Sequence, residues 1–218
     1  MDRVVIYGVG SPLVVDVQES LMRAGIEVAA AVRNMDCADR LLDGVTPIEP
    51  AGLTAEVLAL SFLAPFFTPG NRQKVVREAL HAGFRSGYSL LDPTVPRCRS
   101  LAHGPGLYVN AGCTLGAASE FGEWVLINRG ASIGHHARFG DFVSIGPGVV
   151  VSGSVTLGRG SVVGAGAVVL PELSIGSNSV VGAGAVVTKD VPDNCLVLGT
   201  PAKVVRSAIA GYGDQGVT

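Results

Sequence analysis

Two histidines stand side by side at positions 135 and 136, in a glycine-rich stretch with few other groups that carry chemistry. A neutral imidazole has a pKa of about 6.5, so at pH 7 it can take a proton from an attacking amine or hydroxyl. The four cysteines are widely spaced and form no CxxC pair, which indicates neither a disulfide framework nor a zinc site. What the histidine pair does depends on how the surrounding chain folds.

From Val109 onward the chain repeats every six residues. The first position of every block is apolar: Val109, Leu115, Phe121, Ile127, Ile133, Phe139, Ile145, Val151, Leu157, Val163, Val169, Ile175, Val181 and Val187. The second position favours glycine, and the fifth position holds small or aliphatic residues. A register this clean has a chance probability of roughly 3 in 100,000, before the choice of frame is allowed for.

A six-residue period fits a chain that runs a short strand, turns a corner and repeats. First and fifth positions then point inward, and glycine at the second position tolerates the backbone of the corner. Three faces make a coil of about eighteen residues, and coils stack because none buries its interior alone. His135 then takes an outward third position, with Gly153 one coil away. The alternative is a Gly/Val-rich sandwich with accidental periodicity.

Residues 3–85 follow a different pattern, in which short apolar strands alternate with helices. We expect strands at 4–7, 26–32 and 58–62, and helices at 14–24 and 71–82, which predicts a small parallel sheet covered by helices. The first turn contains Gly8, Gly10 and Ser11 but lacks the third glycine of a dinucleotide-binding motif. It still places N–H groups at a helix N-terminus, which suits a phosphate; a purely structural turn is the alternative.

This change of pattern divides the chain into an α/β domain at 1–85, a linker at 86–108, a β-helix at 109–205 and a tail at 206–218. The net charge of −2 argues against the basic field of a protein that binds nucleic acid or an anionic membrane. We find no signal peptide and no apolar segment long enough to span a bilayer, so we expect a cytoplasmic protein.

The repeat resembles that of the bacterial hexapeptide-repeat acyltransferases, which form a left-handed parallel β-helix. INRGASIGHHARFGDFVSIGPG at 127–148, behind an α/β domain and a linker, resembles the two-domain sugar acetyltransferases. That family includes nucleotide-sugar N-acetyltransferases of the bacillosamine and perosamine type and sialic acid O-acetyltransferases. The ending VVGAGAVVTKDVPDNCLVLGTPAKVV at 180–205 is typical of the wider superfamily. The resemblance implies a Rossmann-like α/β domain followed by a left-handed β-helix.

The resemblance also implies roles around the histidine pair, with His135 in the place of the catalytic base. His136 stands where the family has an acidic residue, and Ser144 where many relatives have a second histidine near the thioester. Asn128 matches an asparagine seven residues before the base. We expect these three residues beside the base or facing the substrate. The plainer alternatives are solvated surface histidines and an asparagine that caps a corner.

By the same resemblance, coenzyme A lies along the β-helix between the subunits of a homotrimer, and no metal takes part. The residues expected to line the coenzyme A groove are Gly153, Gly182, Ala183 and Gly184. The residues expected to hold the nucleotide of a sugar are Gly8, Gly10, Ser11, Gly70 and Asn71.

These expectations predict an enzyme that moves acetyl from acetyl-CoA to the amino group of a nucleotide-linked amino sugar, in polysaccharide biosynthesis. O-acetylation of sialic acid or another sugar is the alternative within the same fold. A catalytically degenerate trimeric scaffold is a second alternative, because His136 and Ser144 depart from the family pattern. A zinc enzyme of the carbonic anhydrase kind needs three histidine ligands on adjacent coils, and no histidine follows His136.

Overall fold

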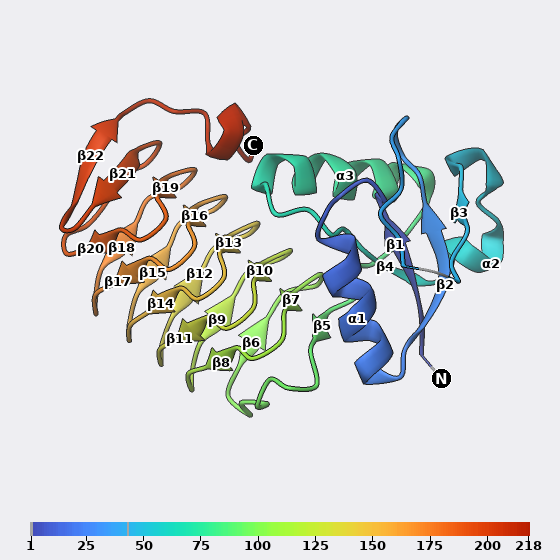
Figure 1. Ribbon diagram of the computed structural model, residues 1–218, viewed down its shortest axis with the longest axis horizontal. Coiled ribbons are helices and arrows are strands. Elements are labelled where there is room, and N and C mark those ends of the chain that lie inside the picture. Colours follow the sequence, from blue (N-terminus) through green and yellow to red (C-terminus); the bar gives the residue numbers. More distant parts are fainter. Residues whose placement is uncertain (1, 43) are drawn as a thin grey trace.

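A computed structural model describes residues 2–42 and 44–218 of the chain. It consists of an α/β unit at the N-terminus and a long parallel β-helix, which lie side by side (Figure 1). The alternating first half and the six-residue repeat predict this architecture. In the part of the chain that the structure describes, no helix is long and apolar enough to cross a membrane.

The N-terminal unit is a parallel sheet of four strands in the order β3-β2-β1-β4. Its strands are β1 (Arg3–Tyr7), β2 (Glu27–Val32), β3 (Pro47–Ile48) and β4 (Ser61–Leu63). Its helices are α1 (Val14–Ala24), α2 (Ala55–Leu58) and α3 (Pro69–Ala82), with one 3-10 turn, η1 (Pro50–Gly52). Helices α1 and α3 end at Gly25 and Gly83, which adopt the left-handed backbone expected of a helix stop.

The strand predicted at 58–62 is wrong in its first half. The side chain of Thr54 accepts a hydrogen bond from the amide of Val57 and so caps helix α2. The chain joins the sheet only at β4, where Phe62 pairs with Val5 of β1. A short apolar run does not by itself distinguish a buried strand from a helical segment, which explains the error.

Three sheets form the faces of the β-helix, and their strands are parallel except for the last strand of the first face. Successive strands within a face are eighteen residues apart over most of its length. The first face contains β5 (Leu90–Leu91), β7 (Tyr108–Val109), β10 (Leu126–Ile127), β13 (Ser144–Ile145), β16 (Val162–Val163), β19 (Val180–Val181), β21 (Leu196–Gly199) and β22 (Ala202–Arg206). The second contains β8 (Thr114–Leu115), β11 (Ser132–Ile133), β14 (Val150–Val151), β17 (Val168–Val169) and β20 (Val186–Val187). The third contains β6 (Ala102–His103), β9 (Glu120–Phe121), β12 (Arg138–Phe139), β15 (Thr156–Leu157) and β18 (Ser174–Ile175).

The interior of the β-helix is filled by the first and fifth positions of the repeat, as predicted. Nearly all of these side chains are buried and belong to one continuous apolar core; Leu115 and Leu173 are only partly buried. Phe121 and Phe139 stack one above the other, with ring centroids 4.7 Å apart. Identical positions on neighbouring coils therefore pack on each other, which fixes the register of every outward residue.

Glycine at the second position has a different cause from the one predicted. The left-handed corner residue is the fourth of the repeat, for example Gly130 with φ 66° and His136 with φ 55°. Where glycine occupies the second position, a side chain would strike the next coil; a Cβ on Gly134, for example, would lie 2.5 Å from the amide nitrogen of Gly153. The close approach of neighbouring coils, and not the dihedral angles of the corner, selects glycine there.

The stretch 86–108 and the tail both take part in the folded structure. Strands β5 and β6 lie within the expected linker and pair with β7 and β9, which begin eighteen residues later. After β22 the chain returns beside the β-helix towards α3, as the red segment of Figure 1 shows. A short 3-10 turn, η2 (Tyr212–Asp214), lies on this return path.

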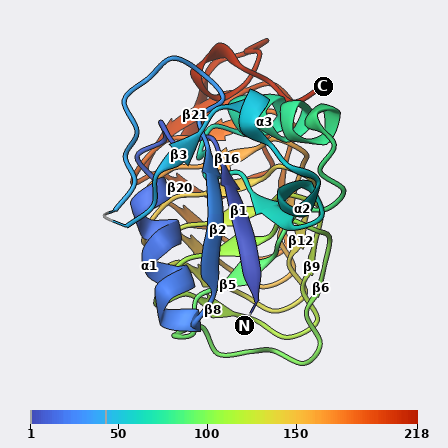
Figure 2. The same ribbon diagram turned by 90° about the vertical axis from the view of Figure 1, so that its right-hand side faces the viewer.

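The N-terminal unit packs against the first face of the β-helix, which we call the docked face (Figure 2). Sixth positions of the repeat point outward, and on the docked face Tyr108, Leu126 and Ser144 are buried. Their equivalents on the other two faces, such as Thr114 and Glu120, are exposed. The N-terminal unit therefore buries outward side chains on the docked face, whereas such equivalents on the other two faces remain exposed.

Trp124 joins the two units by reaching from a corner of the β-helix into the N-terminal core. Its ring centroid lies 5.0 Å from that of Phe62 in β4. Gly87 and Gly106 make room for the ring, because a Cβ at either position would lie within 2.4 Å of an indole carbon. A large aromatic group buried between two units stabilises their relative position strongly.

Arg72 of α3 completes the junction with a buried guanidinium that pairs with no carboxylate among the residues that the structure describes. It donates hydrogen bonds to the carbonyl oxygens of Trp124 and Phe142 on the β-helix, both at 2.8 Å. Within the N-terminal unit it donates to the carbonyl oxygens of Phe66 and Phe67. Burial lowers the pKa of Arg72 to about 9, so the group still carries its charge at pH 7.

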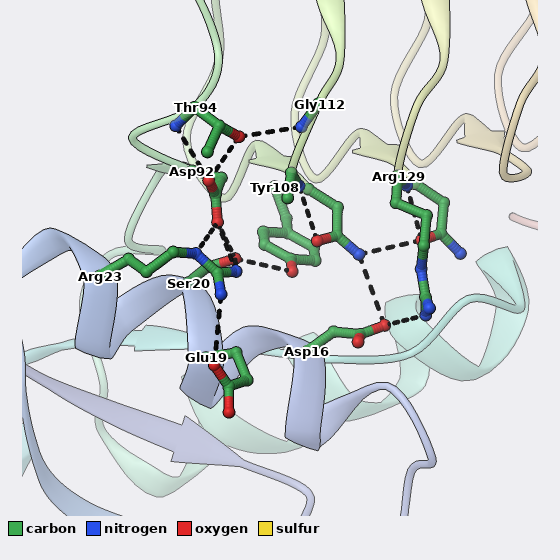
Figure 3. A network of polar contacts seen from close by, with 12 residues as sticks. Asp16, Glu19, Ser20, Arg23, Asp92, Thr94, Tyr108, Gly112 and Arg129 are labelled. Carbon is green, nitrogen blue, oxygen red and sulfur yellow. Dashed lines mark hydrogen bonds and ion pairs between the residues drawn. The ribbon is translucent and has the colours of Figure 1, made fainter.

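A second polar junction links α1 to the first coil of the β-helix (Figure 3). Asp92 follows β5, and its carboxylate accepts hydrogen bonds from Ser20 at 2.7 Å and from the Arg23 guanidinium at 2.7 and 2.9 Å. Burial raises the pKa of Asp92, but the hydrogen bonds from Arg23, Thr94 and Ser20 outweigh it and lower the pKa from 3.8 to about 2. Ionised Asp92 therefore stabilises the docked arrangement.

We predict that Asp92→Asn lowers the free energy of unfolding by about 2 kcal/mol at pH 7. Because the folded pKa lies below the unfolded one, this contribution is fully present well above pH 4 and is lost as the pH falls towards 2. Urea unfolding of both proteins between pH 7 and pH 2.5 measures it, and the two curves should converge at the acid end. A constant difference across this range would show that the charge of Asp92 contributes nothing.

Candidate active site

His135 lies on an outward corner of the β-helix, between β11 and β12, with its side chain exposed. Its ring rests on Gly153 of the next coil, as the eighteen-residue register predicts. A Cβ on Gly153 would come within 2.7 Å of the His135 Cε1 atom and 2.8 Å of its Nε2 atom. The backbone is tied to the same coil, because the amide of Ser154 donates to the carbonyl oxygen of His135 at 2.8 Å. Gly153 thus provides the space that the imidazole occupies.

The His136 ring contacts the ring of His135 edge to face, with the two Nδ1 atoms 3.0 Å apart. One of these nitrogens must carry the proton and the other must accept it. When His135 donates from Nδ1, its Nε2 atom keeps a free lone pair and can act as a base. His136 takes the left-handed backbone of a corner residue, which directs its ring back towards His135. The two rings therefore hold each other in a defined orientation at this corner.

A pocket of about 430 Å³, whose lining includes the charged residues Asp16 and Arg129, lies where the N-terminal unit meets the β-helix. The residues that line it come from the turn before α1, the start of α3 and one corner of the β-helix: Gly10, Ser11, Pro12, Leu13, Asp16, Phe66, Phe67, Thr68, Asn71 and Arg129. Two helix N-termini open into this space, and their backbone dipoles favour an anionic group such as a phosphate. We call it the acceptor pocket.

The charged groups of the acceptor pocket are linked to one another (Figure 3). Arg129 forms an ion pair with Asp16 of α1. Asn110 donates to the side-chain oxygen of Asn128 at 3.0 Å, and the same oxygen accepts from the backbone amide of Arg129 at 2.8 Å. These contacts hold the Asn128 corner of the β-helix against α1. Asn128 thus both caps a corner and faces the pocket region.

A second, mostly apolar cavity of about 320 Å³ runs along the same corner of the β-helix. One wall consists of second and third positions of the repeat on successive coils, and the other consists of side chains from outside the repeat. The lining residues are Phe67, Asn128, Gly146, Pro147, Gly164, Ala165, Val180, Val181, Gly182, Ala183 and Tyr212. We call this cavity the donor groove, after the role proposed for it below.

The acceptor pocket and the donor groove meet. Phe67 lines both, and Asn128 of the groove is followed directly by Arg129 of the pocket. His135 lines neither cavity, since it lies at the next corner, beyond the second face of the β-helix. Within one chain, His135 and the two cavities therefore occupy different edges of the prism.

The structure places the remaining expected site residues as follows. Gly10, Ser11 and Asn71 line the acceptor pocket, and Gly182 and Ala183 line the donor groove. Gly8 lies beneath the Phe66 ring, Gly70 packs against Gln215 of the tail, and Gly184 is a left-handed corner residue. Gly153 lies at the His135 corner and not in the groove.

Ser144 departs most from the expectation that it lies beside the base or faces the substrate. It is fully buried on the docked face, donates to the carbonyl oxygen of Phe67 at 2.6 Å and accepts from Arg72 at 3.0 Å. Its sixth position in the repeat would face solvent, but the N-terminal unit covers it. Ser144 therefore supports Phe67, which lines both cavities, and has no contact with His135.

Four residues that line the cavities were not predicted from the sequence: Asp16, Phe67, Arg129 and Tyr212. Arg129 could have been identified as a site residue from the sequence, because it occupies an outward third position directly after Asn128. Phe67 and Tyr212 lie outside any repeat, so no period places them at the groove. Among the residues that the structure describes, no group of three or more His, Cys, Asp or Glu side chains is arranged to hold a metal ion.

Comparisons with known proteins agree with this geometry. Residues 136–171 and 154–189 match the family model for the bacterial transferase hexapeptide of six repeats. The crystal structure of PerB from Caulobacter crescentus, in complex with CoA and GDP-perosamine, superposes with a TM-score of 0.83 at 33% identity and covers 94% of this chain and 98% of that one. A comparison with curated protein sequences gives no match.

Two further solved structures share the fold. The acetyltransferase domain of PglB from Neisseria gonorrhoeae, in complex with acetyl coenzyme A, has a TM-score of 0.81 at 26% identity and covers 93% of this chain and 98% of that one. WeeI from Acinetobacter baumannii has a TM-score of 0.78 at 21% identity and covers 94% of this chain and all of that one. The α/β unit and the β-helix therefore recur together in other proteins.

We predict that Gly153→Ala displaces the His135 ring and breaks its contact with His136, because the new methyl group would overlap the imidazole. The histidine ring signals in an NMR spectrum should shift relative to the unchanged protein. Gly52→Ala is the matched control, since a Cβ there meets nothing closer than 3.9 Å. Unchanged histidine signals in Gly153→Ala would contradict the placement of the ring.

Proposed function

Because this chain belongs to the two-domain hexapeptide-repeat sugar acetyltransferases, we propose that it transfers acetyl from acetyl-CoA to the amino group of a nucleotide-linked amino sugar. The observation that carries this proposal is that an apolar groove meets a pocket containing charged side chains and two helix N-termini at Phe67 and Asn128. A thioester at the end of the groove would face an amine presented from the pocket. The family relationship supports both the reaction and the co-substrate.

The donor groove suits the pantetheine arm of acetyl-CoA. Its glycine column leaves a channel along the β-helix, and its surface is largely apolar. Within the described residues, the amides of Ala165 and Ala183 donate to no protein acceptor, so they are free to bind the carbonyl groups of the arm. An unpaired N–H group near the thioester would also stabilise the oxyanion that forms when the carbonyl carbon is attacked. PerB has CoA bound in its crystal structure, and the acetyltransferase domain of PglB has acetyl coenzyme A bound.

The acceptor pocket suits the diphosphate of a nucleotide-linked sugar. The N-termini of α1 and α3 provide favourable dipoles near Ser11 and Asn71, and Arg129 adds a positive charge. Binding of a diphosphate would draw Arg129 from its ion pair with Asp16. The freed Asp16 carboxylate would then favour the amino group of the sugar by charge. PerB, the relative at 33% identity, has GDP-perosamine bound in its crystal structure.

His135 serves as the general base, but it must come from a neighbouring copy of the chain. In one chain it lies a full face away from the corner where groove and pocket meet. A homotrimer with its β-helices parallel would place the His135 corner of one subunit against the donor groove of the next. The oligomer is therefore part of the proposed site.

The reaction then follows from these positions. The amine nitrogen attacks the thioester carbonyl carbon while Nε2 of His135 takes the proton, and His136 accepts the hydrogen bond from Nδ1. The oxyanion collapses, the C–S bond breaks, and the sulfur of coenzyme A leaves with a proton from the imidazolium. His136 fixes the tautomer of His135 without a negative charge, which is the task an acidic residue performs in relatives with the usual pattern.

We predict that His135→Ala lowers kcat by about 10²–10⁴-fold, because it removes the proton acceptor. The assay follows free thiol released from acetyl-CoA in the presence of GDP-, UDP- and dTDP-linked amino sugars. His103→Ala is the matched control, since His103 is also exposed on the β-helix but touches neither cavity. No thiol release with any amino sugar, combined with no binding of acetyl-CoA, would overturn the proposal in favour of a scaffold.

A further inference from the structure

The last residues of the chain form a strap along the side of the molecule. We define the C-terminal strap as residues 207–218, which run from the end of β22 back to α3 (Figure 1). The amide of Ile209 donates to the carbonyl oxygen of Asn194 at 2.9 Å, and Ile209 is buried against Val162 and Val180 of the docked face. The strap therefore covers the part of this face that the N-terminal unit leaves free.

The far end of the strap is fixed to both units. The side-chain oxygen of Asn178 accepts from the amide of Val217 at 2.9 Å, and its nitrogen donates to the Val217 carbonyl oxygen at 3.2 Å. Thr218 accepts hydrogen bonds from Gln73 at 2.8 Å and from Arg77 at 3.0 Å on α3. A segment held at its beginning and its end keeps its middle in a defined place.

Tyr212 lies in that middle and lines the donor groove. Its ring meets Phe67 edge to face, with centroids 5.8 Å apart and an interplanar angle of 82°. The side chain is 39% exposed, although it borders an apolar cavity. Together with Phe67, it forms the wall that faces the glycine column of the repeat.

We infer that the C-terminal strap is part of the donor site and that Tyr212 packs against the pantetheine arm of acyl-CoA. A ligand in the groove would cover the exposed part of the ring, and burial of aromatic surface is a large source of binding energy. Phe67 also lines the acceptor pocket, so the Tyr212–Phe67 pair forms a shared boundary between the two substrates. This inference rests on the proposed function, because it requires that the groove takes acyl-CoA.

The binding of coenzyme A, measured by calorimetry, tests the inference. Tyr212→Ala should weaken binding roughly tenfold, about 1.4 kcal/mol, while Tyr212→Phe should bind within twofold of the unchanged protein, since the ring and not the hydroxyl forms the wall. Val205→Ala is the matched control, because Val205 is exposed on β22 outside the groove. Equal affinity in Tyr212→Ala and the unchanged protein would overturn the inference.

The Asn178→Gly variant tests whether the position of the strap matters for binding of acetyl-CoA when the Tyr212 ring itself is kept. Asn178 has φ 54°, which glycine adopts without strain, so the substitution removes the two hydrogen bonds to Val217 alone. It should raise KM for acetyl-CoA several-fold, leave kcat within twofold and leave KM for the nucleotide-linked sugar nearly unchanged. An unchanged KM for acetyl-CoA, or an equal rise in both KM values, would contradict the inference.

Hydrogen exchange distinguishes this inference from the proposed function beneath it. Coenzyme A should slow exchange of the amides at 209–217, whereas a nucleoside diphosphate alone should not. If coenzyme A binds and these amides exchange as before, the strap inference fails and the proposed function stands. If coenzyme A does not bind the unchanged protein at all, the proposed function itself fails.

Discussion

The close stacking of coils at an interval of eighteen residues determines every later feature of this molecule. Amides of one coil donate to carbonyl oxygens of the next, for example Gly134 to Val151 at 2.7 Å and Gly164 to Val181 at 2.8 Å. At nine of the fourteen second positions the residue is glycine, where a Cβ would strike the neighbouring coil or its side chains, so glycines align in columns along the corners. One column forms the floor of the donor groove. At another corner the same spacing sets the His135 ring on Gly153.

The docking of the N-terminal unit completes the walls of the donor groove and the acceptor pocket at the Asn128 corner. Arg72 is buried without a carboxylate, and carbonyl oxygens from both units satisfy its guanidinium together with Ser144. Removing a partner from such a buried charge costs more than the hydrogen bond itself contributes, so the arrangement is rigid. Arg72 bears on function only indirectly, because its guanidinium holds the backbone of Phe67, whose side chain lines both cavities.

Much of the fold could be predicted from the sequence because a period constrains it. The first and fifth positions of the repeat predicted the residues of the core. The third position predicted that His135 is exposed, with Gly153 beside it on the next coil. The docked face also has a signal, since Tyr108, Leu126, Val162 and Val180 place apolar groups at sixth positions, whereas Glu120 and Arg138 mark a free face. That comparison between faces explains why Ser144, at the same position, is buried.

Other parts of the site could not be predicted, because they depend on contacts between segments that no period relates. Phe67 follows β4 and Tyr212 lies in the strap, and they meet only because both ends of the strap are fixed. The Arg129–Asp16 ion pair likewise joins residues more than a hundred positions apart. The short helix α2 was missed because capping by Thr54 is a local interaction that an apolar run conceals.

The central claim is that a base from one subunit acts at the groove of another, and subunit mixing tests it most directly. His135→Ala removes the base, and Ala183→Trp fills the groove from an exposed, outward position. Each variant alone should be nearly inactive. Refolded together in equal amounts, they should recover roughly a quarter of the normal activity, because each site draws one element from each of two subunits. Mixed oligomers without any recovered activity would show that base and groove belong to the same chain and would contradict this account.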